Sequence, residues 1–474
     1  MARRCFFLVF GLCVVLLTSC EQAHRYGPVV KEPPNEVDPD AGKPSYRLAW
    51  MEPRTRHDVP IVFIASTDAQ WQRLPKFWNA SPFGAGMPTV HIGQEPLGAM
   101  LSLAMTEQAM VVKIKVPRGL PDPTPLIPPT NPPSLGQWRL GQKLFFERKL
   151  QAGADTYSCA SCHNPDRGFS DADPRPNGAA YNTLSLINVA YNRRQFWDGR
   201  VQTLEETVVR SLNDERTVSP DEQRERALKH HVWGGFVSTL VSENKYGDDF
   251  DVVFGIDHAT QDSVAQALAT YMRTILAGDS LFDRTADPKT ADQFKAALDD
   301  ATALVLRDQY AKDRPREEMP QLLAKGYELF KGKAGCVQCH KGPLFTDQDY
   351  HNIGYPGDEG YPPIGKETGR ATQTPIGFKE ARLIGAFRTP SLRNLIKTRP
   401  YFHNGALQTL PQVVDFYDQG VQYTPRLAKA LKGEQPLNLT LELNLTLDER
   451  DALVMFLRSL EGTPVDPLVA APAK

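Results

Sequence analysis

The spacing of apolar residues predicts that most of the chain from Trp138 onward is helical. One helix is expected to start at an Asp262 cap, to be ended by Gly278, and to present four apolar residues on one face: Val264, Leu268, Met272 and Ile275. Thr446 and Glu449 form a capping box for another helix, whose apolar residues are Ala452, Leu453, Phe456, Leu457 and Leu460. The pattern indicates a mainly α chain with few strands.

The segment 46–116 has a different pattern. It contains two short apolar runs, 60–65 and 111–116, and three large aromatic residues, Trp71, Phe77 and Trp78. We expect a small N-terminal β-containing module of unknown role. Residues 117–134 follow and contain eight prolines. Such a density excludes helix and sheet interiors and favours a stiff, extended connector.

The N-terminus has the pattern of an export signal. Two arginines precede an apolar stretch, 5–17, which is shorter than the roughly 18 residues that a membrane span needs. The residues Leu-Thr-Ser-Cys20 resemble a bacterial lipobox, which implies removal of residues 1–19 and lipidation of Cys20. An ordinary signal with an incidental cysteine is the alternative. We expect 20–45 to be a polar tether and the protein to face the periplasm, anchored to a membrane through Cys20.

Composition and charge narrow the range of functions. The 474 residues include 54 basic and 56 acidic side chains, so the net charge of −2 shows no electrostatic footprint for nucleic acid. A hydrophobic content of 41% is too low for a protein that crosses a membrane several times. Of the seven cysteines, two leave with the signal and one is the lipidation site. The remaining four could pair as disulfides in an exported chain, but their neighbours point to another use.

The chain beyond the connector is internally duplicated. Residues 140–145 precede Cys159-Ala-Ser-Cys162-His163, and residues 325–330 precede Cys336-Val-Gln-Cys339-His340. The correspondence continues in two further pairs of segments: 183–188 with 389–394, and 196–204 with 402–410. Two copies of one motif set predict two copies of one cofactor-binding unit.

The motif Cys-x-x-Cys-His is the attachment signature of c-type haem. Its two thiols, Cys159 and Cys162 or Cys336 and Cys339, form thioether bonds, and the adjacent histidine ligates the iron. Zinc is the competing interpretation, but zinc ribbons pair such motifs about 15–20 residues apart, a far shorter interval than here. A thioredoxin-like site would need a βαβ setting, which the pattern lacks. The sequence therefore predicts two covalent c-type haems, on His163 and His340.

The two haem motifs, together with Phe196-Trp-Asp-Gly-Arg200 and Pro400-Tyr-Phe-His-Asn-Gly405, resemble the bacterial di-haem cytochrome c peroxidase and MauG superfamily. The resemblance covers 135–462. It implies two cytochrome-c-like α domains, an N-terminal peroxidatic haem domain over 135–285 and a C-terminal electron-transfer haem domain over 286–462. Residues 463–474 would be a tail.

The resemblance also implies a sixth ligand for the C-terminal haem, fourteen residues after the histidine of the Phe-His-x-Gly motif. That position holds Tyr417, as in MauG-like members, whereas conventional peroxidases have methionine there. A phenolate favours ferric and higher-valent iron. The alternative is that Tyr417 only packs on its helix. The corresponding position of the first half is Ser211, which is no haem ligand.

The N-terminal haem is expected to be open on one side. Conventional peroxidases close it with a histidine that lies between the haem motif and the tryptophan, and 164–229 contains no histidine. Cleavage of the peroxide O–O bond needs a group that moves a proton between its oxygens. The family places a glutamate there, and Glu215 is the best match, with Asp214 second. Alternatively, these residues form a solvated charge cluster.

The resemblance assigns roles to further residues. Trp197 corresponds to the electron relay between the haems, with simple packing as the alternative. Ala334 replaces the surface tryptophan through which MauG oxidises its protein substrate. A calcium ion is implied at Asn182, Thr398 and Pro400, whose amide and carbonyl oxygens suit a hard cation. His351 is expected to be a surface or loop residue.

Three functions remain open. The first is a di-haem oxidoreductase that reduces hydrogen peroxide with electrons from a small redox protein, such as a cytochrome or a cupredoxin. The second is MauG-like oxidation of residues in a partner protein. The third is a non-enzymatic electron-transfer or redox-sensing haem lipoprotein.

Overall fold

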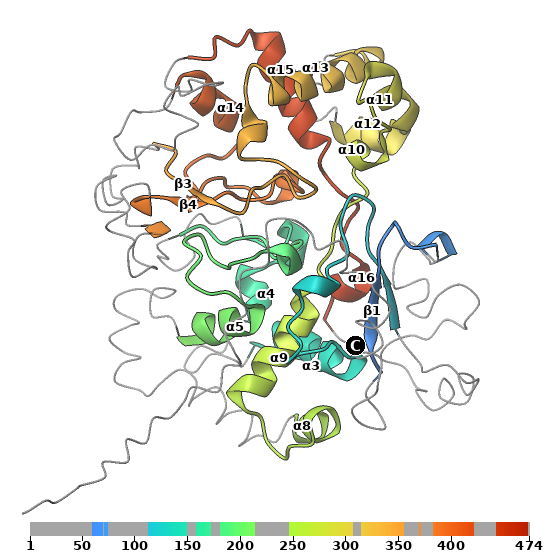
Figure 1. Ribbon diagram of the computed structural model, residues 1–474, viewed down its shortest axis with the longest axis vertical. Helices are drawn as coiled ribbons and strands as arrows, with labels where there is room; N and C mark the ends of the chain where they lie inside the picture. Colours follow the sequence, from blue (N-terminus) through green and yellow to red (C-terminus); the bar gives the residue numbers. More distant parts are fainter. Residues whose placement is uncertain are drawn as a thin grey trace, which may run out of the picture. The chain divides into compact units, whose positions relative to one another are not determined.

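The computed structural model describes these parts of the chain: 59–69, 71–73, 112–148, 158–171, 181–213, 246–306, 314–354, 369–370, 383–420 and 442–472. The expected signal, Cys20 and the tether lie outside these parts, and so do Asp214 and Glu215. Within them, no helix combines the length and the apolar character needed to cross a membrane. The described chain is rich in helices and has few strands (Figure 1).

The first hydrophobic core is built around two crossing helices. The helices of this half are α3 (Leu135–Phe146), α4 (Cys159–Cys162), α5 (Leu204–Asn213), α8 (Gly247–Phe254) and α9 (Gln261–Met272). A Cβ atom at Gly141 of α3 would lie 2.0 Å from the carbonyl oxygen of Ala267 on α9. Only glycine permits this approach. Trp138 is fully buried beside the crossing and donates from Nε1 to Thr274 Oγ1 at 2.9 Å.

The start of α9 differs from the expectation. The cap is Thr260, whose hydroxyl accepts from the Ser263 amide in a capping box, and Asp262 lies in the first turn. Its negative charge suits the N-terminal end of the helix dipole there, which explains why sequence alone favoured it. The helix also ends at Met272, earlier than Gly278. The four apolar residues expected on one face, Val264, Leu268, Met272 and Ile275, are all buried.

The strands of the N-terminal segment belong to the same core. Strands β1 (Ile61–Ile64) and β2 (Val112–Lys115) pair in parallel and occupy the two apolar runs seen in the sequence. Ile61 and Phe63 of β1 and Val112 and Ile114 of β2 pack in one cluster with residues of α3 and α9, whereas Ile64 packs against Trp71. The short helix α16 (Pro467–Ala470) also reaches this core, where Val469 accepts from the Tyr271 hydroxyl at 2.6 Å.

The second core repeats the crossing. Its helices are α10 (Leu281–Arg284), α11 (Ala291–Ala297), α12 (Asp300–Leu306), α13 (Met319–Lys331), α14 (Leu410–Asp418) and α15 (Leu447–Arg458). A Cβ atom at Gly326 of α13 would again lie 2.0 Å from a carbonyl oxygen, that of Ala452 on α15. The predicted capping box of Thr446 and Glu449 starts α15. Strands β3 (Tyr350–His351) and β4 (Phe387–Arg388) pair antiparallel.

Positions that correspond in the sequence repeat adopt the same uncommon backbone conformation. Phe169 and Phe345 have φ values of 54° and 53°, and Asn188 and Asn394 have 60° and 61°. Phe196 and Phe402 follow with 65° and 68°. Such left-handed conformations are rare for residues other than glycine. Short 3₁₀ helices complete the described structure: Trp71–Arg73, Thr124–Leu126, Pro165–Arg167, Val189–Tyr191, Arg316–Glu318, Cys336–Gln338 and Leu395–Lys397.

Candidate haem sites

The first Cys-x-x-Cys-His motif folds as a single helical turn. Helix α4 carries both thiols, and His163 follows it directly. The Nδ1 atom of His163 lies 3.1 Å from the carbonyl oxygen of Phe169. This bond assigns the proton to Nδ1 and leaves the lone pair on Nε2, the arrangement that iron-ligating histidines use. Burial lowers the pKa of His163, so the imidazole is held in the neutral form that binds a metal.

The second motif has the same local geometry. His340 Nδ1 lies 2.9 Å from the carbonyl oxygen of Phe345, and burial lowers the pKa of this imidazole as well. All four described cysteines are free thiols. Burial raises the pKa of Cys159 to about 12, and that of Cys336 to about 12. The pairs are thus two separate thiol sites with a histidine beside each.

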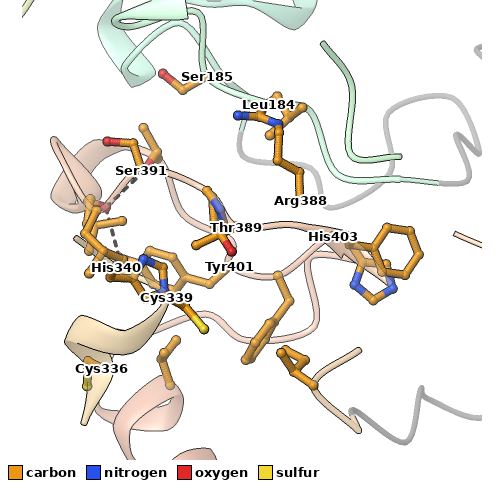
Figure 2. A pocket seen from close by; sticks show the side chains of 18 of the residues that line it. Leu184, Ser185, Cys336, Cys339, His340, Arg388, Thr389, Ser391, Tyr401 and His403 are labelled. Carbon is orange, nitrogen blue, oxygen red and sulfur yellow. Dashed lines mark hydrogen bonds between the residues drawn. The ribbon is translucent and has the colours of Figure 1, made fainter. Parts of the chain in front are cut away.

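One cavity is lined by residues from both halves. The C-terminal half contributes Cys336, Cys339 and His340, and the N-terminal half contributes Asn182 and Trp197. Figure 2 shows the histidine and the two thiols gathered on one side of this space. Two thiols, an imidazole whose Nδ1 is engaged and a largely apolar wall are the groups that a covalently attached haem requires. The residues present therefore fit the cofactor that the sequence predicts.

Tyr417 lines the same cavity as His340. It lies on α14, which starts at a capping box formed by Thr409 and Gln412. Its ring is 6.4 Å from that of Phe402, measured between centroids. Burial raises the pKa of Tyr417, and the neighbouring thiols of Cys339 and Cys336 raise it further. The free phenol is therefore neutral, and a bound ferric ion would have to displace its proton.

Trp197 is 8% exposed and is held between the two halves. Its Nε1 donates to the Asn182 carbonyl oxygen at 2.8 Å, and its own carbonyl accepts from the Arg388 amide at 2.8 Å. The indole meets the His403 ring edge to face, with centroids 6.4 Å apart. His403 in turn stacks on Phe387 at 3.8 Å. The indole orientation is fixed by contacts from both halves.

The three residues expected at the calcium site come together. Asn182, Thr398 and Pro400 all line the cavity. The Asn182 amide nitrogen donates to the Pro400 carbonyl oxygen at 2.7 Å and reaches that of Phe402 at 3.3 Å. The Asn182 Oδ1 atom is buried and has no hydrogen-bond partner. An orphaned buried oxygen beside backbone carbonyl oxygens is a donor set that a hard cation could use.

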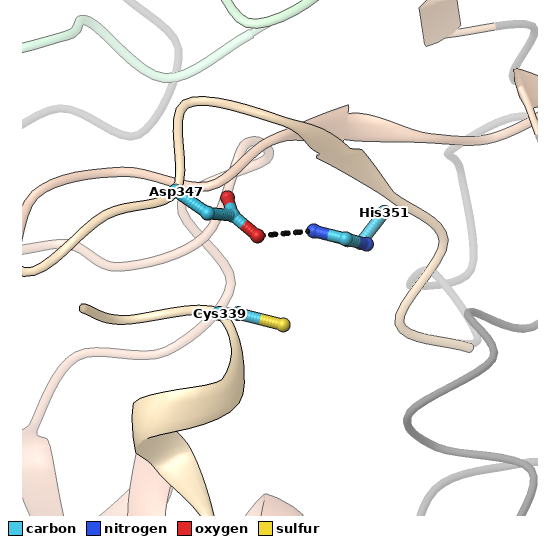
Figure 3. A group of neighbouring side chains, drawn as sticks. All are labelled: Cys339, Asp347 and His351. Atoms are coloured by element: carbon cyan, nitrogen blue, oxygen red, sulfur yellow. Dashed lines mark hydrogen bonds and ion pairs between the residues drawn. The ribbon is translucent and has the colours of Figure 1, made fainter. Parts of the chain in front are cut away.

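The sequence reasoning misplaced His351. It lies on β3, is only 23% exposed, and pairs through Nε2 with Asp347 Oδ2 at 2.8 Å. Cys339 Sγ lies within 4.8 Å of both groups (Figure 3). Burial disfavours the protonated imidazole, but hydrogen bonds to Asp347 and Cys339 outweigh it and raise the pKa of His351 to about 10. Because the Cys339 sulfur belongs to the haem motif, we assign this pair to the haem environment. No periodic pattern in the sequence marks β3.

The acid–base candidates Glu215 and Asp214 fall just beyond the described end of α5. Two glutamates earlier on that helix have structural contacts. Glu205 Oε1 forms an ion pair with Arg273 at 2.8 Å, and Glu206 accepts from the Gln202 amide at 3.0 Å. The Glu205 ion pair connects α5 to the end of α9, and the Glu206 hydrogen bond stabilises the turn that precedes α5.

Comparisons with known proteins identify the family. The family model "Di-haem cytochrome c peroxidase" matches residues 136–291. The cytochrome-c peroxidase IdrP1 of Pseudomonas sp. (strain SCT) is 30% identical over 395 residues, covering 77% of this chain and 90% of that protein. The methylamine utilization protein MauG of Methylorubrum extorquens is 31% identical over 374 residues, with coverage of 77% and 90%.

Solved structures show the same fold. A MauG-like protein associated with microbial copper homeostasis matches with a TM-score of 0.54 and 22% identity, over 76% of this chain and 97% of that chain. The di-haem peroxidase BthA from Burkholderia thailandensis matches with a TM-score of 0.52 and 20% identity, over 73% and 93%. The fold, the paired Cys-x-x-Cys-His sites and the relatives together show that this chain is a peroxidase-like enzyme with two c-type haems, a member of the di-haem cytochrome c peroxidase and MauG superfamily.

Proposed function

We propose that this protein reduces hydrogen peroxide in the periplasm with electrons from a small cytochrome or cupredoxin. The observation that carries the proposal is a buried tryptophan held between the two halves that bear the histidine sites. His163 and His340 each engage Nδ1 with a backbone carbonyl, which leaves Nε2 available for a haem iron, and Trp197 is held by hydrogen bonds with Asn182 and Arg388. When bound, the haems supply iron that can take two oxidising equivalents from peroxide.

We propose unequal roles for the two sites. The His163 side has no second histidine in 164–229, and Ser211 on α5 is exposed, which supports an open site where peroxide binds. The His340 side has Tyr417 in its cavity, which supports a closed site with a tyrosine ligand. Glu215, with Asp214 as the second candidate, would move the proton between the peroxide oxygens, because it best matches the position of the family's glutamate.

The test is the reaction of the diferric protein with stoichiometric peroxide, followed by visible absorption. We expect a rapid spectral change, then fast return of the starting spectrum when a reduced small cytochrome or cupredoxin is added. The haem content must first be shown to be two per chain. A fully loaded protein whose spectrum does not respond to peroxide would contradict the proposal.

A second candidate is MauG-like oxidation of residues in a partner protein. Tyr417 in the cavity of His340 favours it. Against the route used by MauG, Ala334 occupies the position of the surface tryptophan and is only 3% exposed. An oxidised state that persists with small donors and decays only when a particular protein is added would favour this candidate over peroxide reduction.

Substituting Trp197 with phenylalanine is expected to slow the use of electrons from the donor. Phenylalanine preserves much of the packing but is far harder to oxidise, and it cannot donate to the Asn182 carbonyl. We expect turnover with a reduced donor to fall by at least about tenfold, or about 1.4 kcal/mol in activation free energy. Steady-state oxidation of the donor measures it. Phe196→Leu, at the neighbouring position, is the control and should retain most of the activity.

We propose a calcium ion at Asn182, Thr398 and Pro400. Wild-type protein is expected to lose thermal stability when calcium is chelated and to regain it with calcium, because a ligand bound only to the folded state stabilises by about 2.7 kcal/mol at a hundredfold excess over its Kd. Asn182→Ala removes the orphaned Oδ1 and should abolish this response. Thermal unfolding with EGTA or calcium measures it. An equal calcium response in wild type and Asn182→Ala would contradict the assignment.

We propose that Cys20 anchors the mature protein to a membrane after residues 1–19 are removed. The lipobox-like sequence supports this location. Cys20→Ser is expected to release the protein into the soluble periplasmic fraction while leaving its haem content unchanged. Fractionation and intact-mass measurement would show this. A membrane-bound Cys20→Ser protein would exclude the anchor.

We also infer that the two haem domains, 135–285 and 286–462, arose by duplication of one unit. The matched crossings at Gly141 and Gly326 support this inference. An experimental holoprotein structure in which the α3–α9 and α13–α15 pairs could not be superposed would argue against it.

A further inference from the structure

Arg388, on β4, is a buried positive charge with neutral partners. It is 5% exposed. Its Nη1 donates to Asn192 Oδ1 at 3.0 Å, and its Nε reaches the Phe196 carbonyl oxygen at 3.4 Å. Among the described residues, no carboxylate lies within ion-pair distance, 4.0 Å, of its guanidinium. Burial lowers the pKa of Arg388, so the site bears a desolvation cost that a nearby anion would offset.

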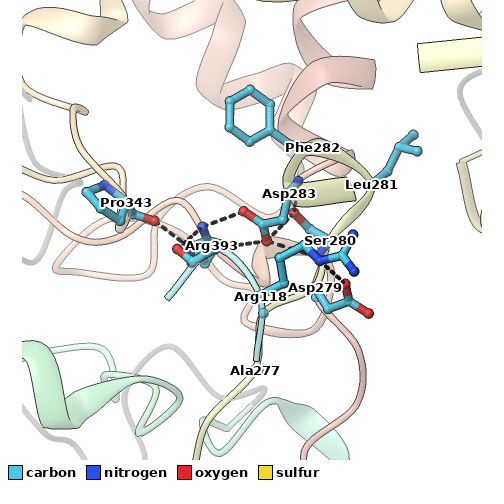
Figure 4. A network of polar contacts seen from close by, with 12 residues as sticks. Arg118, Ala277, Asp279, Ser280, Leu281, Phe282, Asp283, Pro343 and Arg393 are labelled. Atoms are coloured by element: carbon cyan, nitrogen blue, oxygen red, sulfur yellow. Dashed lines mark hydrogen bonds and ion pairs between the residues drawn. The ribbon is translucent and has the colours of Figure 1, made fainter. Parts of the chain in front are cut away.

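Three other arginines that are well buried have a carboxylate partner. Arg393 forms an ion pair with Asp283 at 2.7 Å, and both side chains are at most 3% exposed (Figure 4). The other two pairs are Arg273 with Glu205 at 2.8 Å and Arg200 with Asp198 at 3.2 Å. In these three cases the chain itself supplies a counter-charge to the buried guanidinium.

The cross-strand neighbour of Arg388 does not supply the missing charge. Tyr350 is its register partner in the β3–β4 pair. Burial raises the pKa of Tyr350 in spite of the surrounding arginines. Its phenol is therefore neutral at physiological pH and cannot act as the counter-ion.

Arg388 lines the cavity that holds Cys336, Cys339 and His340. Figure 2 shows the two thiols on one side of this space and Arg388 toward the other. Thioether bonds form at the vinyl edge of a haem, and its two propionate groups lie at the opposite edge of the porphyrin. A haem attached through these thiols thus directs its carboxylates away from them, toward the side of the cavity where Arg388 lies.

We propose that Arg388 binds a propionate of the C-terminal haem and thereby positions the Phe196–Trp197 segment against it. This inference rests on the proposed haem site at Cys336, Cys339 and His340. The backbone amide of Arg388 donates to the Trp197 carbonyl, and its Nε reaches that of Phe196. One residue thus connects the haem carboxylate to the segment that carries the tryptophan, which makes Arg388 a positioning residue.

The test compares Arg388→Gln, Arg388→Lys and the wild type by spectroelectrochemistry of the diferric protein. Loss of a buried positive charge favours the ferric state. In Arg388→Gln we expect the equilibrium constant for reduction of the C-terminal haem to fall by about tenfold, or about 59 mV for one electron. Arg388→Lys retains the charge and should stay within about twofold of the wild type.

Arg194→Gln is the matched control. Arg194 reaches the nearby Gly199 carbonyl at 3.4 Å and is absent from the cavity wall. Its substitution should leave the potential unchanged. The propionate bending band in the resonance Raman spectrum should shift in Arg388→Gln and, to a smaller extent, in Arg388→Lys.

The outcomes separate this inference from the proposed function. A wild-type protein without haem on Cys336 and Cys339 would overturn the haem site itself. Two bound haems with an unchanged potential in Arg388→Gln would overturn only the role of Arg388. The role of Arg388 would also be overturned by a tenfold change in the equilibrium constant for reduction in Arg388→Lys, or by an unshifted propionate band in that variant. Both measurements on Arg388→Lys remain decisive if Arg388→Gln fails to fold.

Discussion

Replacing His163 with glycine is expected to abolish the reaction with peroxide while the C-terminal haem site stays intact. His163 Nδ1 lies 3.1 Å from the Phe169 carbonyl oxygen, which leaves Nε2 available to ligate a haem iron. Without it, the iron loses the ligand that fixes its position and supplies electron density to it. We expect the peroxidase rate to fall by at least about 10²-fold, the loss that a misplacement of about 1 Å can cause.

Imidazole rescue makes this experiment specific. The glycine variant leaves space for free imidazole, which should restore part of the activity if the ligand itself is missing. Haem content by the pyridine haemochrome method must remain two per chain, because Cys159 and Cys162 are untouched. His258→Ala is the matched control, since His258 is exposed and lies in the loop before α9. Full peroxidase activity in the unrescued His163→Gly protein would place the reaction elsewhere.

Replacing Tyr417 with methionine is expected to raise the reduction potential of the C-terminal haem strongly. A phenolate stabilises ferric iron, whereas a thioether favours the reduced state. The change should be a sizeable fraction of the roughly 0.8 V that axial ligands span. It should be accompanied by new visible and EPR spectra. The prediction follows from the position of Tyr417 in the cavity of His340.

Tyr401→Phe is the control for this substitution. Tyr401 lines the same cavity, but its hydroxyl donates to the Leu395 carbonyl at 2.9 Å. Losing that hydrogen bond should cost only about 1 kcal/mol in the free energy of unfolding and should leave the spectra unchanged. Identical EPR spectra for wild type and Tyr417→Met would show that Tyr417 only packs in the cavity wall.

The features that could be predicted from the sequence are those that depend on local spacing. Cys-x-x-Cys-His places both thiols and the imidazole on one turn of chain, so the two sites could be predicted from the motif alone. The distance from His403 to Tyr417 likewise follows from one short connection and the helix that Thr409 caps. The capping box of α15 is also local, and the structure confirms it.

Other residues could not be placed because their role depends on contacts across the fold. Thr260 competes with Asp262 as a cap, and only the backbone conformation decides between them. His351 lies on the two-residue strand β3, which no periodic pattern marks, and the pairing of β3 with β4 is part of the fold that brings it beside Cys339. The strands of 46–116 were expected as part of a module of their own, and their core residues pack with α3 and α9.

The sequence by itself determined the class of chemistry of this protein, because two Cys-x-x-Cys-His motifs indicate two c-type haems, whereas the role of Tyr417 stays a prediction. It could do so because covalent haem attachment is encoded within five consecutive residues. The tertiary structure alone decided which side chains face each other between the halves. In the folded chain Asn182 donates to the Pro400 carbonyl, and Trp197 donates to the Asn182 carbonyl. Arg388 is buried beside neutral partners. The burial of a side chain and the presence of a counter-charge beside it depend on tertiary contacts, so the spacing of residues along the chain does not predict them.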